Sequence, residues 1–284
     1  MAFDHEAILN WSFPPVRNAY AQRDVMLYAL GLGLGFRPTD PAELRYVYED
    51  GLEVFPTMPV VLGHPGPWMR DPATGIDFVR VLHAEQHLEI HRPLPSEGAT
   101  VARNRVLDVI DKGPGKGVLI VMERLLHDEA SGELLCTQRS VAIARGNGGA
   151  GGTGNPSPDP HPLPAREPDG HVDIRTATQA ALLYRLSGDY NPVHADPAVA
   201  ARAGFSAPIL HGLASFGIAA RAVLQAFDAA PGALRSFGVR FSAPVYPGET
   251  VRTEFWRDAD VVSFRSRVLE RDAVVLNNGR AVLG

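Results

Sequence analysis

The chain has 284 residues, of which 45% are hydrophobic, and it carries a formal net charge of −5. A chain of this length can bury a large core, and the net negative charge argues against nucleic acid as a partner. The single cysteine, Cys136, excludes an intrachain disulfide and a zinc cluster built from cysteines.

Targeting and membrane signals are missing from the sequence. The start has no basic segment followed by an apolar run, and no stretch approaches about 18 uninterrupted apolar residues. The last residues, 281–284, do not form a peroxisomal tripeptide. We therefore expect a cytoplasmic protein without a membrane partner.

The predicted elements of the first half are helical segments followed by strands. Residues 27–42 belong to the predicted helical part. The β-rich runs at 100–110, 118–127 and 134–144 are separated by glycine and proline turns. The glycine-rich segment 146–154 and the proline-rich run that follows have the composition of a flexible and then extended linker.

The second half repeats this order. Helical spacing before Gly188 ends at a residue suited to a left-handed cap, and Asp196 with Pro197 is typical of a helix start. A buried helix is predicted to begin near Gly212, and strands are predicted at 237–241, 251–256, 261–268 and 273–282. Helices followed by an antiparallel meander in each half predict an α+β fold.

The two halves are related to each other. A gapless alignment of residues 27–42 with 183–198 matches Leu, Tyr, Leu, Asp, Pro and Ala at equivalent positions. We predict an N-terminal repeat at 1–145, a linker at 146–170 and a C-terminal repeat at 171–284.

Three hydrogen-bonding side chains gather around Pro192 within six residues, and they are Asp189, Asn191 and His194. Pro192 restrains the backbone, and a carboxylate and an imidazole that share a water can divide general-base and general-acid duty. Taken alone, such a turn is more often capping chemistry than catalysis. Gly212 follows at a helix start, where its N–H could stabilise an oxyanion, although it could also simply allow the turn.

The block Tyr-Arg-Leu-Ser-Gly-Asp-Tyr-Asn-Pro-Val-His at 184–194, with the later His-Gly at 211–212, resembles MaoC-like (R)-specific enoyl-CoA hydratases. This family includes the hydratase part of peroxisomal multifunctional enzymes. Segments 81–86, 111–113 and 240–248 also resemble family blocks. The resemblance implies a double hot-dog fold, in which each repeat wraps an antiparallel sheet around a long central helix. It also implies hydration of trans-2-enoyl-CoA to (3R)-3-hydroxyacyl-CoA without a metal or organic cofactor.

The resemblance also implies roles for single residues. Asp189 and His194 would be the catalytic pair, Asn191 would orient water or substrate, and the Gly212 N–H would bind the thioester oxygen. Further residues would fall along the acyl-CoA groove, namely His83, Ala84, Lys112 and Phe241. Ala84 departs from the family, which commonly has glycine there.

The aligned residues of the two repeats indicate one active site per chain. The residues aligned with Asp189, Asn191 and His194 are Gly33, Gly35 and Pro38. The first repeat therefore has no equivalent pair, and we expect it to shape the acyl pocket and part of the CoA groove.

Several alternatives stay open at this point. A hot-dog thioesterase would act on the same ligand class, and a non-enzymatic acyl-CoA-binding protein is a second alternative. Lys112 and Lys116 could form a basic spot for the nucleotide of CoA, or could simply be a solvated hairpin tip. Two repeats in one chain imitate a dimer of single hot-dog domains, and further association into a homodimer is left open.

Overall fold

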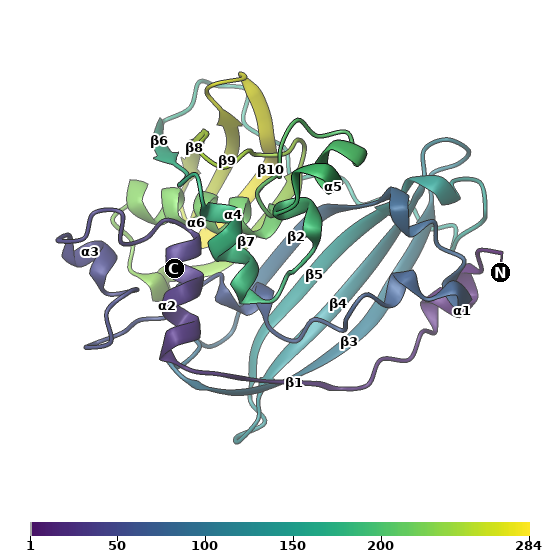
Figure 1. The fold of residues 1–284 in the computed structure, drawn as a ribbon, viewed down its shortest axis with the longest axis horizontal. Helices are drawn as coiled ribbons and strands as arrows, with labels where there is room; N and C mark the ends of the chain where they lie inside the picture. The colour runs from purple at the N-terminus through teal and green to yellow at the C-terminus, as the bar shows by residue number, and fades with distance from the viewer. Residues whose placement is uncertain (1) are drawn as a thin grey trace.

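The computed structural model describes residues 2–284, and its strands form one continuous antiparallel sheet (Figure 1). The strands of the first half are β1 (Val16–Tyr20), β2 (Val81–Ile90), β3 (Gly98–Asp111), β4 (Val118–Asp128) and β5 (Leu134–Ala144). Those of the second half are β6 (Gly170–Arg175), β7 (Leu234–Phe241), β8 (Thr250–Asp258), β9 (Val261–Val268) and β10 (Ala273–Leu283).

The strand order shows an internal duplication. The order across the sheet is β1-β3-β4-β5-β2-β7-β10-β9-β8-β6. From its outer edge to the centre, the first half runs β1-β3-β4-β5-β2 and the second runs β6-β8-β9-β10-β7, which is the same connectivity. The two halves join where β2 pairs with β7.

In each half, helices lie between the first strand and the second, and one more helix precedes β1. They are α1 (His5–Leu9), α2 (Gln22–Gly31) and α3 (Pro41–Leu44) in the first half, and α4 (Ala180–Tyr184), α5 (Pro197–Arg202) and α6 (Gly212–Ala226) in the second. The equivalent helices α2 and α4 pack on each other, with the rings of Tyr28 and Tyr184 5.8 Å apart. These two tyrosines occupy matching positions in the sequence repeat, so the duplicated segments meet across a pseudo-twofold arrangement.

The central helix of the second repeat is α6. It packs against β6, β7, β8 and β10, and ten of its 15 residues are buried. Gly217 allows the first half to approach this helix, because an added Cβ would lie 2.6 Å from the side chain of Leu32. Helix α6 is thus the centre of the largest apolar core, which contains residues of both halves.

The first repeat has no counterpart of α6 among the described residues, so the expected long central helix is present only in the second repeat. Residues 51–80 instead form loops and short 3₁₀ turns such as Met58–Val61 and Trp68–Arg70. The physical reason is local, because prolines stand at 56, 59, 65, 67 and 72 and interrupt helical hydrogen bonding. This irregular segment packs on β3 and β4 through Trp68 and Met69.

The glycine-rich segment after β5 is fixed in place, in contrast to the flexible linker that its composition suggests. The Asp111 carboxylate of β3 accepts hydrogen bonds from the amides of Gly149 and Gly151, both at 2.9 Å. Thr153 donates to Asp108 at 2.5 Å. An added Cβ on Gly152 would lie 2.6 Å from a carbonyl oxygen of β3, so glycine is needed for this close approach.

Helix lengths also bear on membrane insertion. Within residues 2–284, no helix is long and apolar enough to cross a membrane.

Candidate active site

The loop between α4 and α5 is held by its own side chains. Gly188 ends the α4 segment with a φ of +116°, a left-handed conformation that favours glycine. The Asp189 carboxylate accepts from the Asn191 amide at 3.0 Å, and the Asn191 side-chain oxygen accepts from the Val193 amide at 3.2 Å. Asp196 then caps α5. The loop is therefore a short connection fixed at both ends, as its sequence predicts.

The tautomer of His194 follows from its hydrogen bond to a carbonyl. The Nδ1 atom lies 2.8 Å from the carbonyl oxygen of Ile209, which can only accept, so Nδ1 carries the proton. The Nε2 atom is left with a free lone pair, and it lies 3.9 Å from Oδ2 of Asp189. This separation is too long for a direct hydrogen bond and suits a shared water.

The two members of this pair have different surroundings. His194 is buried, whereas the Asp189 side chain is 57% exposed. Burial lowers the pKa of His194, and the Ile209 carbonyl and the Asp189 carboxylate only partly oppose it. The imidazole is therefore neutral at physiological pH and can accept a proton at Nε2.

His211 is a further member of the site that the residue-level analysis of the sequence did not single out. Its ring stacks on that of His194 with centroids 3.7 Å apart, and its Nε2 donates to the Asp189 carbonyl oxygen at 3.1 Å. Burial, followed by the neighbouring His194, lowers the pKa of His211 to about 4. Its signals in the sequence were its position directly before the helix that starts at Gly212 and its place in the His-Gly at 211–212 that resembles the family.

The start of α6 faces an aromatic side chain. Gly212 is the first residue of this helix, and its N–H belongs to the first turn, where intrahelical acceptors are missing. An added Cβ on Gly212 would lie 3.3 Å from the Phe241 ring. The backbone amide of Gly212 is thus accessible beside Phe241 because no side chain covers it.

The first repeat reaches this place through β2. The ring of His83 lies 4.8 Å from that of Phe241, and its Nε2 donates to the carbonyl oxygen of Glu85 at 2.9 Å. Desolvation by the surrounding protein lowers the pKa of His83 to about 4, although the residue keeps an exposed surface. Ala84 follows His83 at a register shift between β2 and β5, which is a bulge.

Lys112 stands apart from the other predicted site residues. It lies in the turn between β3 and β4, where its amide donates to the Gly117 carbonyl at 3.0 Å. Its side chain is exposed, and within residues 2–284 it forms neither a hydrogen bond nor an ion pair. The structure therefore brings together Asp189, His194, Gly212, Phe241 and His83, and its contacts do not connect Lys112 to them.

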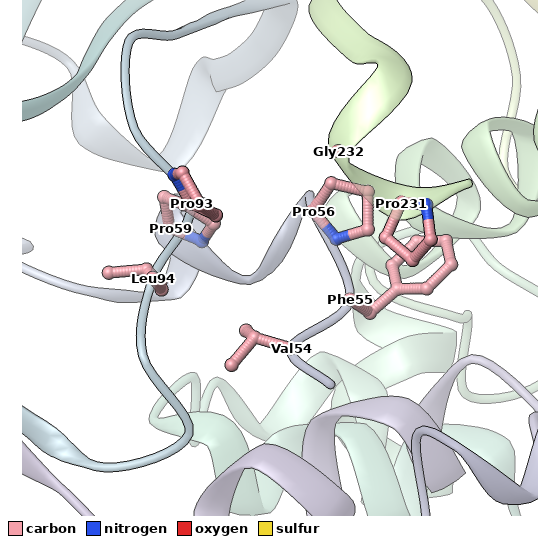
Figure 2. Close-up of a pocket in the computed structure, with 8 residues that line it drawn as sticks. All are labelled: Val54, Phe55, Pro56, Pro59, Pro93, Leu94, Pro231 and Gly232. Carbon is pink, nitrogen blue, oxygen red and sulfur yellow. The ribbon is translucent and has the colours of Figure 1, made fainter. Parts of the chain in front are cut away.

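Two further features bear on ligand binding. One ligand atom each of Asp189, His194 and His211 lies within 4.8 Å of the others, so these side chains could jointly contact a water or hold a metal ion. Elsewhere, an apolar recess lies where the two halves meet (Figure 2), lined by Val54, Phe55, Pro56, Pro59, Pro93, Leu94, Pro231 and Gly232. That recess has no titratable side chain, so it offers no acid–base chemistry.

Comparison with known sequences gives matches across both halves. Residues 18–146 match the MFE-2 hydratase 2 N-terminal domain, and residues 161–278 match the MaoC like domain. Enoyl-CoA hydratase 2, peroxisomal, of Arabidopsis thaliana is 37% identical, over 96% of this chain and 94% of its own length. Peroxisomal multifunctional enzyme type 2 of Mus musculus is also 37% identical over 93% of this chain, which spans 36% of that protein.

Solved structures agree with the sequence matches. A MaoC-like dehydratase from Phytophthora capsici has a TM-score of 0.86 and 34% identity, with 99% of each chain covered. A Mycobacterium tuberculosis protein described as having a double hotdog fold is 16% identical with a TM-score of 0.55, so it bears on the fold alone.

The chain therefore belongs to the MaoC-like hydratase family and has the α+β double hot-dog fold. Within that family it is an enzyme of the hydratase and dehydratase class.

Proposed function

We propose that the protein catalyses the reversible syn hydration of trans-2-enoyl-CoA to (3R)-3-hydroxyacyl-CoA. Relatives named enoyl-CoA hydratases support the substrate class, including the one from Arabidopsis thaliana. The observation that carries the proposal is the 3.9 Å separation between Nε2 of His194 and Oδ2 of Asp189, directly beside the start of α6.

The proposed reaction begins with a water held between these two atoms. The water loses one proton to the pair while its oxygen forms a bond to C3 of the enoyl chain. The π electrons of the double bond move toward the thioester carbonyl, whose oxygen gains negative charge. The proton is then delivered to C2, so atoms and charge balance. Because the one water and the pair lie on one face of the substrate, addition is syn.

The charge that develops on the thioester oxygen needs a donor. The Gly212 N–H lies at a helix N-terminus, which carries partial positive charge and is fixed before the reaction starts. Losing a comparable donor in other enzymes costs about 3 kcal/mol of transition-state stabilisation. A single amide in this position could therefore account for a large part of the rate.

The surroundings of Asp189 and His194 indicate only in part which of the two acts as the base. The lowered pKa of His194 keeps its imidazole neutral and able to accept a proton, while the exposed Asp189 carboxylate can hold the water by accepting from it. The two groups interact closely, so the formal base belongs to the pair. The Asn191 side-chain oxygen is engaged by Val193, which leaves its NH₂ group to orient water or substrate.

The groove residues take the roles that the family resemblance implies. His83, Ala84 and Phe241 would contact the acyl-CoA near the thioester, and Lys112 would reach the nucleotide end. The reaction consists of proton transfers and oxyanion stabilisation, so we propose that it needs no metal or organic cofactor. A cytoplasmic location and a homodimer remain predictions, and several relatives are peroxisomal by name.

One assay tests the proposal against a thioesterase. The protein is mixed with a trans-2-enoyl-CoA while the absorbance of the conjugated double bond and the release of free thiol are followed together. The proposal predicts loss of the double bond, no thiol release and a 3R product. Thiol release without loss of the double bond would show a thioesterase, and a 3S product would refute the predicted stereochemistry.

A further inference from the structure

A polar row crosses the inner face of the first repeat. Asn104 on β3, Arg124 on β4 and Gln138 on β5 are direct cross-strand neighbours in the sheet register. Leu126 and Cys136 on one side of the row belong to the main apolar core, and Ile120 on the other side belongs to a second apolar cluster. The polar row, with its cationic side chain, therefore lies between apolar neighbours.

The guanidinium of Arg124 has no anionic partner. Its Nε donates to Asn104 at 3.1 Å, and its Nη1 donates to the Leu62 carbonyl at 2.8 Å and lies 3.3 Å from the Gln138 side-chain oxygen. Within residues 2–284, no carboxylate lies within 4.0 Å of it. Nη2 has no hydrogen-bond partner in the protein, and it is an atom that solvent can reach. Burial lowers the pKa of Arg124 to about 10, so it stays charged at neutral pH.

Arg124 is partly buried, and an unpaired charge that is partly removed from water is costly. Transferring an isolated cation out of bulk water costs several kcal/mol, and buried charges are normally paired. Arg221 follows that rule, since its guanidinium lies 2.7 Å from the carboxylate of the buried Glu43. The free Nη2 of Arg124 points instead to an anion that is absent from the chain itself.

His64 indicates that water can reach this region. Its side chain is exposed, yet the surrounding protein lowers its pKa to about 4, with the Arg124 charge acting in the same direction and the Asp189 carboxylate opposing it. His83 has the same combination of exposure and a low pKa. Both side chains therefore combine contact with solvent and surroundings that disfavour a charged imidazole. The charges of both Arg124 and Asp189 therefore act on the pKa of His64.

A run of contacts connects His83 with the thioester position. Gly212 adjoins Phe241, and Phe241 adjoins His83, as described above. In the sheet register, His83 is paired with Ala142 of β5, and Arg124 is paired with Gln138 of the same strand. The two rows are therefore four residues apart along β5. That corresponds to about 13 Å along the strands. The backbone of Arg124 therefore lies away from the His83 row along the sheet, although the Arg124 charge still acts on His83.

We propose that Arg124 is a specificity-determining residue that binds a carboxylate at the far end of the acyl chain. The inference rests on the proposed hydratase function. The substrates it selects are 2-enoyl-CoA thioesters whose chain ends in a carboxylate, and the Nη2 group supplies the charge-assisted hydrogen bond.

Arg124 also has a structural contact that the experiment must separate from ligand binding. Through the Val60 and Leu62 carbonyls it holds the segment that precedes His64 onto the sheet. A purely structural role predicts lower stability and equal loss of activity on all substrates. A role in recognition predicts a change in preference between substrates, measured within one protein preparation.

The test uses pairs of trans-2-enoyl-CoA substrates of equal length, one ending in methyl and one in carboxylate, over a series of lengths. The ratio of their kcat/KM values is measured for the wild type, Arg124→Gln, Arg124→Lys and the exposed Arg103→Gln as a matched control. Binding of the corresponding saturated acyl-CoA pairs is measured by calorimetry on the same proteins, so the inference is tested even if no hydration occurs.

The expected result is a wild-type preference for the carboxylate-ended chain at one range of lengths. Arg124→Gln should reduce that preference by roughly 10- to 100-fold, as for loss of a hydrogen bond to a charged group. Arg124→Lys should reduce it less, and Arg103→Gln should keep it. A wild type that favours the methyl-ended chain in hydration and binding at every length would overturn the inference, even if the Arg124 variants do not fold. If neither acyl chain is hydrated but binding still favours the carboxylate-ended one, only the proposed function is refuted.

Discussion

The replacement of His211 by glutamine gives a prediction whose magnitude follows from the structure. His211 is 2% exposed, and its pKa falls from 6.5 to about 4, chiefly through burial. Glutamine cannot titrate, but its amide can still donate to the Asp189 carbonyl, as His211 Nε2 does. The variant therefore removes a proton-binding group while keeping the hydrogen bond.

The sign of the effect follows from proton linkage. Above pH 6.5 the imidazole is neutral in both the folded and the unfolded chain. As the pH falls below 6.5, the unfolded chain binds a proton that the folded chain does not, so the free energy of unfolding decreases. The interval from 6.5 to about 4 corresponds to about 3 kcal/mol, of which about 2 kcal/mol is lost by pH 5.

The assay is urea denaturation followed by tryptophan fluorescence, for wild type and His211→Gln at about pH 7.5 and about pH 5. Histidines with lowered pKa values that do not contact His211, such as His161, are common to both proteins and cancel in the comparison. The wild type should lose about 2 kcal/mol more than the variant between the two conditions. Equal losses in the two proteins would refute the conclusion that His211 is held neutral in the folded chain.

Two other substitutions have defined outcomes. Arg221→Met should lower the free energy of unfolding by about 3 kcal/mol, because it leaves the buried Glu43 without this partner. The control, Arg252→Met in a surface ion pair, should lower it by under about 1 kcal/mol. Similar losses for the two variants in urea denaturation would contradict this prediction. Gly212→Ala should lower kcat roughly 10-fold with little change in KM, because the added methyl group would crowd the Phe241 ring. The control, Gly232→Ala, should match the wild type, because its methyl group meets nothing within 4 Å. An unchanged kcat for Gly212→Ala would argue against an oxyanion role for the Gly212 amide.

Local signals in the sequence predict many elements of this fold correctly. The strand predicted at 261–268 is β9, and the helix predicted near Gly212 is α6. Asp196 and Pro197 start α5 as predicted. These features depend on capping groups and on periodicity within one segment, so a short window of sequence contains the information that determines them.

The first repeat shows where reasoning from the family pattern failed. A long helix was expected there, and irregular turns are found at 51–80. The five prolines between positions 56 and 72 were a local signal against a helix. The fixed glycine-rich segment has a different cause, because carboxylates of the distant Asp108 and Asp111 hold it. Composition alone could not indicate those partners.

The candidate site depends both on local sequence and on contacts between distant segments. The Asp189–His194 spacing around Pro192 is local, and the structure places those side chains 3.9 Å apart. The stacking of His211 on His194 and the unpaired charge of Arg124 depend on segments brought together by folding. Such features follow from the tertiary arrangement, so a single sequence does not reveal them.

The most direct test of the account is the turnover of trans-2-enoyl-CoA by Asp189→Asn and His194→Gln, with thermal unfolding measured on the same samples. Each variant should lose roughly 100-fold or more in kcat. The exposed Asp189 side chain can be replaced without an unfolding cost, so Asp189→Asn should also keep the wild-type melting temperature. A folded Asp189→Asn protein with near wild-type turnover would contradict the assignment of the carboxylate and the imidazole as the pair that activates water.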